Sequence, residues 1–165
     1  MSRVSRLPLF ALLLGLLALA GCNREGSAPA EPAARPSPTL PTSQEDGEWR
    51  QYISRMVGHH VRVRRGVPPF AVYLSPADDD ETRMRTIDNA NQTLQRGVLK
   101  DTVLAFGSRD SALMARHMPE IFEGLPENRL KGARVVFVGR AEDRAAAEAA
   151  IAGSGAEFIF LEFGS

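Results

Sequence analysis

The sequence has 165 residues, in which 20 lysines and arginines balance 20 aspartates and glutamates, and 44% of the residues are hydrophobic. This length fits one domain of ordinary size with some chain to spare, and zero net charge without a long basic run argues against a nucleic-acid partner. A single cysteine excludes an internal disulfide and a zinc site built from several thiolates.

The N-terminus has the pattern of a secretory signal. Arg3 and Arg6 precede a mostly apolar run over residues 7–21, and these two parts match the charged and hydrophobic regions of such signals. The run is shorter than the roughly 20 apolar residues that a membrane-spanning helix needs. We therefore predict a signal peptide over residues 1–21.

The end of this run resembles the lipobox of bacterial lipoproteins, on the residues Leu19-Ala20-Gly21-Cys22. The resemblance implies that residues 1–21 are cleaved and that Cys22 carries acyl chains such as palmitate, which makes the lipid bilayer a partner. Asn23, where an Asp would signal retention at the inner membrane, favours the inner leaflet of the outer membrane, facing the periplasm. The alternative is an ordinary thiol beside a conventional cleavage site.

A change in composition separates the lipobox from the rest of the chain. Residues 22–47 are rich in proline, alanine and serine, and Leu40 is the only large apolar residue among them. Such a segment cannot bury enough apolar surface to offset its ordering entropy. We predict a disordered tether over residues 22–47, followed by a single globular domain over residues 48–165.

Hydrophobic periodicity predicts the elements of this domain in chain order. Apolar residues at helical spacing over residues 49–57 predict an amphipathic helix that ends at Gly58. Residues 61–65 alternate apolar and basic side chains, which predicts a half-exposed, antiparallel edge strand. The same periodicity predicts further helices over residues 82–98, 108–125 and 141–152. It predicts strands over residues 70–74, 103–106, 135–138 and 156–163. Pro119 is expected to kink or split the second of these helices.

This alternation of strands and helices favours an α/β fold. The prediction is a three-layer sandwich with about four mostly parallel strands flanked by helices, plus the antiparallel edge strand. In open sheets of this kind, ligands bind beyond the carboxyl ends of the strands. That rule selects residues 75–81, 107–111 and 139–143 as the candidate site.

An anion is one ligand that these loops could hold. Ser108, Arg109 and Asp110 follow a predicted buried strand and open a helix, and Arg140 follows the next strand. Free N–H groups at the helix start, together with the two arginines, suit a phosphate or carboxylate. The alternative is that Ser108 or Asp110 only caps the helix.

The acidic run at residues 78–81 also has two interpretations. Asp78 and Asp80 could bind a hard cation through oxygen atoms. However, the run lacks the spacing of a calcium loop, and acidic residues are expected at a helix start because they complement the helix dipole. We therefore favour a solvated cap and turn and predict no metal site.

No catalytic constellation is recognisable. The nucleophile motif G-x-S-x-G is absent, and His59, His60 and His117 lack the spacing of a metal site. We assign no catalytic residue and no cofactor, and the chain is not predicted to be an enzyme of known type.

Two further features bear on packing and partners. Asn91 lies within an apolar stripe and is expected to hydrogen-bond a neighbouring loop. Arg62 and Arg64 lie on one face of the predicted edge strand, where charge either blunts edge-to-edge pairing or marks the docking site of a partner strand.

The sequence thus predicts a lipid-anchored protein of the bacterial cell envelope whose α/β domain binds an envelope protein in the periplasm, as an accessory or assembly module. The alternative is a small-ligand binding protein, or an unrecognised enzyme, that uses the strand-end loops.

Overall fold

The structure, a computed structural model, describes residues 36–165. The predicted signal peptide, the lipidation at Cys22 and the tether up to residue 35 lie outside the described residues. Within residues 36–165, no helix combines the length and the apolar character needed to cross a membrane.

Helices and strands alternate along the described chain. They are α1 (Asp46–His60), β1 (Phe70–Tyr73), α2 (Asp80–Arg96), β2 (Val103–Gly107), α3 (Ser111–Ile121), β3 (Arg134–Gly139), the 3-10 helix η1 (Ala141–Asp143), α4 (Arg144–Ala150) and β4 (Glu157–Glu162). The strands form one four-stranded sheet in the order β1-β2-β3-β4, and every pair is parallel. The predicted α/β sandwich is confirmed.

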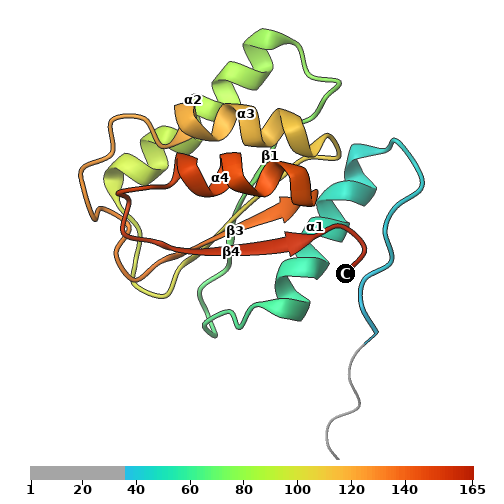
Figure 1. Cartoon of the computed structure of the whole chain (residues 1–165), viewed down its shortest axis with the longest axis horizontal. Coiled ribbons are helices and arrows are strands. Elements are labelled where there is room, and N and C mark those ends of the chain that lie inside the picture. The colour runs from blue at the N-terminus through green and yellow to red at the C-terminus, as the bar shows by residue number, and fades with distance from the viewer. Residues whose placement is uncertain (1–35) are drawn as a thin grey trace, which may run out of the picture. The chain divides into compact units, whose positions relative to one another are not determined.

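The helices cover the two faces of the sheet unequally. Because each strand lies next to the one before it, connections of constant handedness place α2, α3 and α4 on the same face. The opposite face is covered by α1, as Figure 1 shows. The molecule therefore has three layers, with α1 as the only helix of its layer among residues 36–165.

Side chains alternate between two cores across the sheet. Leu104 and Phe106 of β2 pack beneath α2 and α3, whereas Val103 and Ala105 pack against α1. The central strands β2 and β3 are almost fully buried, which is why their sequences are apolar on both faces. On the α1 face, Tyr52 is completely buried.

The predicted edge strand over residues 61–65 is wrong. Val61 instead ends α1, where its N–H donates to the carbonyl oxygen of Val57 at 2.9 Å and its side chain is buried. A turn follows, closed by a 3.1 Å bond from the Val67 N–H to the Arg64 carbonyl. The alternation of this segment matches a strand, but only Val61 finds a place in the core. The strands β1 and β4 are therefore the two edges of the sheet.

The domain begins before the predicted boundary at residue 48. The helix α1 starts at Asp46, and Ser43 already contacts it. The Ser43 hydroxyl donates to Glu48 Oε2 at 2.7 Å, and the Trp49 Nε1–H donates to the Ser43 carbonyl at 2.9 Å. Residues 43–47, assigned to the tether from their composition, thus pack onto the domain.

The helix α3 is shorter than predicted. It begins at Ser111 and ends at Ile121, only two residues after Pro119, instead of continuing to residue 125. A proline in the last turn lacks one helical hydrogen bond and helps to end the helix. The side-chain amide of Asn91, on α2, donates to the Ile121 carbonyl at this end.

Candidate functional site

The three segments selected from the sequence lie beyond the carboxyl ends of the parallel strands, at one end of the sheet, which we call its carboxyl edge. The Leu74 N–H, just after β1, donates to the Gly107 carbonyl at 3.3 Å. The Arg140 N–H, just after β3, donates to Ser111 Oγ of α3 at 2.9 Å. The register of the sheet brings the strand ends level, so the segments after β1, β2 and β3 are neighbours.

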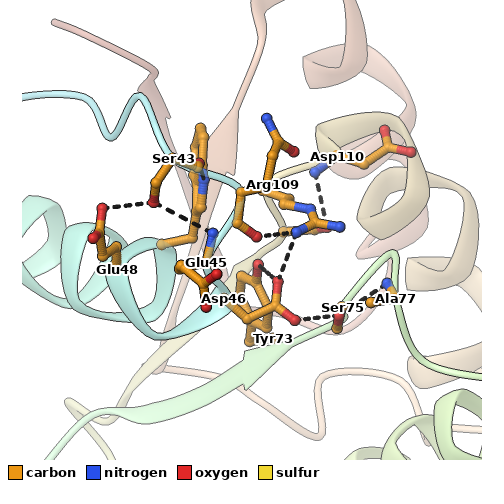
Figure 2. Close-up of polar contacts among 12 residues, drawn as sticks. Ser43, Glu45, Asp46, Glu48, Tyr73, Ser75, Ala77, Arg109 and Asp110 are labelled. Atoms are coloured by element: carbon orange, nitrogen blue, oxygen red, sulfur yellow. Dashed lines mark hydrogen bonds and ion pairs between the residues drawn. The ribbon is translucent and has the colours of Figure 1, made fainter.

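The centre of this edge is a carboxylate that the sequence analysis missed. Tyr73 Oη donates to Asp46 Oδ1 at 2.8 Å, and the Ser75 hydroxyl donates to Asp46 Oδ2. Arg109 Nη1 lies 3.5 Å from Asp46 Oδ1 and also donates to the carbonyl oxygen of Gln44. Figure 2 shows these side chains converging on Asp46 from different segments.

Each member of this Asp46 cluster comes from the end of an element. Asp46 is the first residue of α1, where a negative charge complements the helix dipole. Tyr73 ends β1 and Ser75 follows shortly after, whereas Arg109 follows β2. The cluster therefore fastens the start of α1 to the carboxyl edge of the sheet.

The pKa values follow from these contacts. Burial acts to raise the pKa of the Asp46 carboxyl, but the hydrogen bonds from Ser75 and Tyr73 and the positive charge of Arg109 outweigh burial and hold it below its usual range. The pKa of the Tyr73 phenol is raised, first by burial and then by its hydrogen bond to Asp46. At neutral pH, Asp46 is therefore ionised and Tyr73 is a neutral donor.

Ser108 and Asp110 serve the start of α3. Asp110 is the N-cap, and its Oδ1 accepts from the Leu113 N–H at 3.3 Å. The Ser108 side chain is completely buried, and its Oγ accepts from the Asp110 N–H at 3.0 Å. This is the capping alternative for these two residues. Arg109 is held by Asp46 and Gln44, and Arg140 is exposed.

The acidic run at the start of α2 is a cap and turn, as favoured from the sequence. Asp79 Oδ1 accepts from the Thr82 N–H at 2.8 Å, and this bond lowers the pKa of Asp79. Arg83 donates to Asp80 Oδ1 and to the Asp78 carbonyl, both at 2.6 Å. In the described part of the chain, no group of three or more His, Cys, Asp or Glu residues could hold a metal ion.

The histidines lie apart from the Asp46 cluster. His117 Nδ1 on α3 is 3.2 Å from the Glu120 carboxylate. The His59 and His60 rings are 4.5 Å apart at the end of α1.

A second candidate site, also missed from the sequence, runs along the free edge of β1. A hollow of about 260 Å³ lies where β1 meets α2 and Arg50 of α1, and another of about 330 Å³ lies between β1 and α1. The first is lined by Arg50, Phe70, Ala71, Val72, Tyr73, Thr86, Asn89, Ala90 and Thr93. The second is lined by Ile53, Ser54, Val57, Gly58, Val63, Pro69, Ala71 and Ala105. Ala71 lines both, so the two hollows meet at the strand, and we call them together the β1 groove.

The chain was compared with protein-family models, with curated proteins and with solved structures, and none of them matches. The domain has two candidate sites, which differ in character. The Asp46 cluster is polar and its groups are bonded to one another, whereas the β1 groove is open.

Proposed function

We propose that this chain is a lipid-anchored protein of the bacterial cell envelope whose α/β domain binds another protein in the periplasm, as an accessory or assembly module. The lipobox residues ending at Cys22 and the proline-rich segment after them support the anchor and the tether. Two or three buried acyl chains, at about 0.8 kcal/mol per CH₂, hold a protein firmly on a membrane.

The observation that carries the binding role is the β1 groove. It exposes the edge of a sheet and partly apolar hollows on one surface of the domain, and exposed sheet edges are common sites of protein recognition. The small-ligand alternative has less support. The polar side chains that it needs, Ser108, Arg109 and Asp110, already form hydrogen bonds within the protein.

Crosslinked affinity capture tests this proposal. The tagged full-length protein is crosslinked in its native membrane, solubilised and purified, beside a Cys22→Ser variant that cannot be acylated. We expect one envelope protein to dominate the recovery from the anchored form and to fall strongly in the variant. Equal recovery from both forms would refute a role for the anchor, and recovery of nothing specific from either form would refute the binding role.

A further inference from the structure

We propose that the free edge of β1 accepts an extended, acidic segment of another protein, which adds to the four-stranded sheet as a further strand. This inference rests on the proposed binding function and specifies the chemistry of the partner. It is carried by three features of the β1 groove: the direction of its backbone groups, the two hollows, and the charge around it.

The first feature is a set of outward-facing backbone groups. The Leu74 N–H bonds the Gly107 carbonyl, and the direction of the main chain alternates along a strand. The N–H and C=O groups of Val72 therefore point toward β2, as those of Leu74 do. The N–H and C=O groups of Ala71 and Tyr73 point away from β2, to the unpaired side of β1. Within residues 36–165, β1 pairs with no strand but β2.

The second feature is the space beside the strand. An added strand directs alternate side chains to opposite faces of the sheet. The hollow bounded by Thr86 and Thr93 of α2 lies toward one face, and the hollow bounded by Ile53 of α1 lies toward the other. Because the hollows meet at Ala71, side chains of one extended segment can enter both.

The third feature is a concentration of positive charge in a neutral chain. Residues 49–77 contain no Asp or Glu, and their arginines are Arg50, Arg55, Arg62, Arg64 and Arg65. Arg50 lines the groove and lies 4.6 Å from the centre of the Tyr73 ring. Arg62 and Arg64 flank Val63, which lines the groove as well. Arg55, Arg62, Arg64 and Arg65 form no ion pair within the described residues.

This charge selects the occupant. A second copy of the chain, paired edge to edge through β1, would bring two sets of these arginines together, and their repulsion disfavours that arrangement. An acidic segment instead gains attraction to arginines that lack a carboxylate partner. The groove therefore favours an acidic strand of a different protein.

Peptide binding to the full-length protein in detergent tests this inference. The probe is a fluorescein-labelled peptide of about eight residues in which glutamate and valine alternate, and its counterpart alternates lysine and valine. Main-chain hydrogen bonds supply much of the affinity in strand addition, so a generic strand is sufficient. We expect saturable anisotropy with the glutamate peptide, weakened by salt, and none with the lysine peptide. Equal binding of both peptides, or of neither, would overturn the proposal.

Variants of Ala71 test the binding mode. Ala71→Pro removes an outward N–H that β2 does not use, and proline is tolerated on an edge strand in that position. We expect at least about a tenfold loss of peptide affinity, a difference of about 1.4 kcal/mol, whereas Ala71→Ser, which keeps the N–H, binds normally. Unchanged binding by Ala71→Pro would contradict strand addition.

Charge reversal tests the recognition of acidic residues. Arg64→Glu should weaken binding of the glutamate peptide several-fold. The matched variant Arg116→Glu, at an exposed position on α3, should not. Equal effects of the two variants would show that only the net charge of the protein matters and would contradict a local contact.

Hydrogen exchange on the unmodified protein gives a readout that does not depend on any variant folding. The amides of Ala71 and Tyr73 should become protected when the glutamate peptide is added, and unchanged exchange at both would overturn the proposal. Light scattering tests whether a second copy of the chain occupies the edge instead. A dimer that Ala71→Pro converts to a monomer would assign the edge to a second copy and overturn the proposal. The two proposals can fail separately. If wild type and Ala71→Pro capture the same protein partner equally well, the binding function is supported but strand addition at β1 is refuted.

Discussion

The side-chain amide of Asn91, on α2, donates to the carbonyl oxygen of Ile121, the last residue of α3, at 3.0 Å. The same Nδ2 group also lies 2.9 Å from the Glu123 carbonyl, beyond the helix end. The last carbonyl groups of a helix have no partner within it, and Asn91 satisfies two main-chain oxygens at this end. The hydrogen bond to a neighbouring loop expected from the sequence is thereby confirmed.

Replacing Asn91 should destabilise the domain. Asn91→Ala removes the side-chain donor of the Ile121 carbonyl, whereas the Glu123 carbonyl keeps a bond from Gln95 Nε2 at 3.2 Å. We expect the free energy of unfolding to fall by about 1–2 kcal/mol. Gln92→Ala, at the exposed neighbouring position, is the matched control and should change little. Urea unfolding measures both. An equal loss in the two variants would mean that the bond to α3 does not account for the effect, because alanine is itself the best helix former.

The Asp46 cluster should make stability depend on pH. Because the pKa of Asp46 in the folded protein lies below the ordinary value of 3.8, folding favours its ionised form. This contribution is fully present above the unfolded pKa and is lost as the pH falls through the folded one. Asp46→Asn should therefore be less stable than the wild type at neutral pH, with a difference that narrows below pH 3.8.

Urea unfolding as a function of pH checks this dependence, with Asp88→Asn, at an exposed position on α2, as the control. The control should follow the wild-type curve across the whole range. A gap between Asp46→Asn and the wild type that stays constant through the acid range would show that the charge of Asp46 is not the source of its stabilisation.

Two glycines should respond in opposite directions to alanine. A Cβ at Gly139, the last residue of β3, would lie 2.7 Å from the Phe137 ring and against Ser111 Oγ, and such overpacking typically costs about 1–3 kcal/mol. A Cβ at Gly58 in α1 meets nothing within 4 Å, and alanine there should stabilise the helix by about 0.5–1 kcal/mol. The midpoint of thermal unfolding should fall for Gly139→Ala and rise for Gly58→Ala. A higher midpoint for Gly139→Ala would contradict the close packing of Gly139 against Phe137 and Ser111.

Inorganic phosphate should not stabilise the protein. The anion-binding interpretation of the strand-end loops needs Arg109, which is engaged by Asp46 and the Gln44 carbonyl. A ligand at about 100 times its dissociation constant would add about 2.7 kcal/mol of stability, which a thermal-shift measurement detects readily. We expect no shift with phosphate. A shift that Arg109→Ala abolishes would restore the small-ligand function.

Most of the fold could be predicted because its buried strands are apolar on both faces and are separated by helical periodicity. The strand Val103–Gly107 and its neighbour Arg134–Gly139 are recognisable from composition alone. The prediction of a strand at residues 61–65 was wrong because an alternation of apolar and basic residues indicates which side chains are exposed, and does not show that the main chain is hydrogen-bonded to a neighbouring strand. Pro68 and Pro69, which follow directly, lack N–H groups, and only Val61 reaches the core.

The Asp46 cluster could not be predicted, since it depends on contacts between residues far apart in the chain. Asp46 lies at the end of a polar, proline-rich segment, so composition assigned it to the tether. One local signal was available: Asp46 precedes Trp49 by three residues, the position of an acidic residue in the first turn of a helix. Its bonds to Tyr73 and Ser75 follow only from where the helix packs.

The strand order β1-β2-β3-β4 has a consequence for the order of folding. Each new strand finds its neighbour in the segment made just before it, so the βα units can assemble in sequence through near-neighbour contacts, which favour rapid folding. The helix α1 is different, because it packs across strands that include β4, and the Gly164 N–H donates to its Tyr52 Oη at 2.8 Å. The first helix of the described residues thus completes its packing only when the last strand is in place.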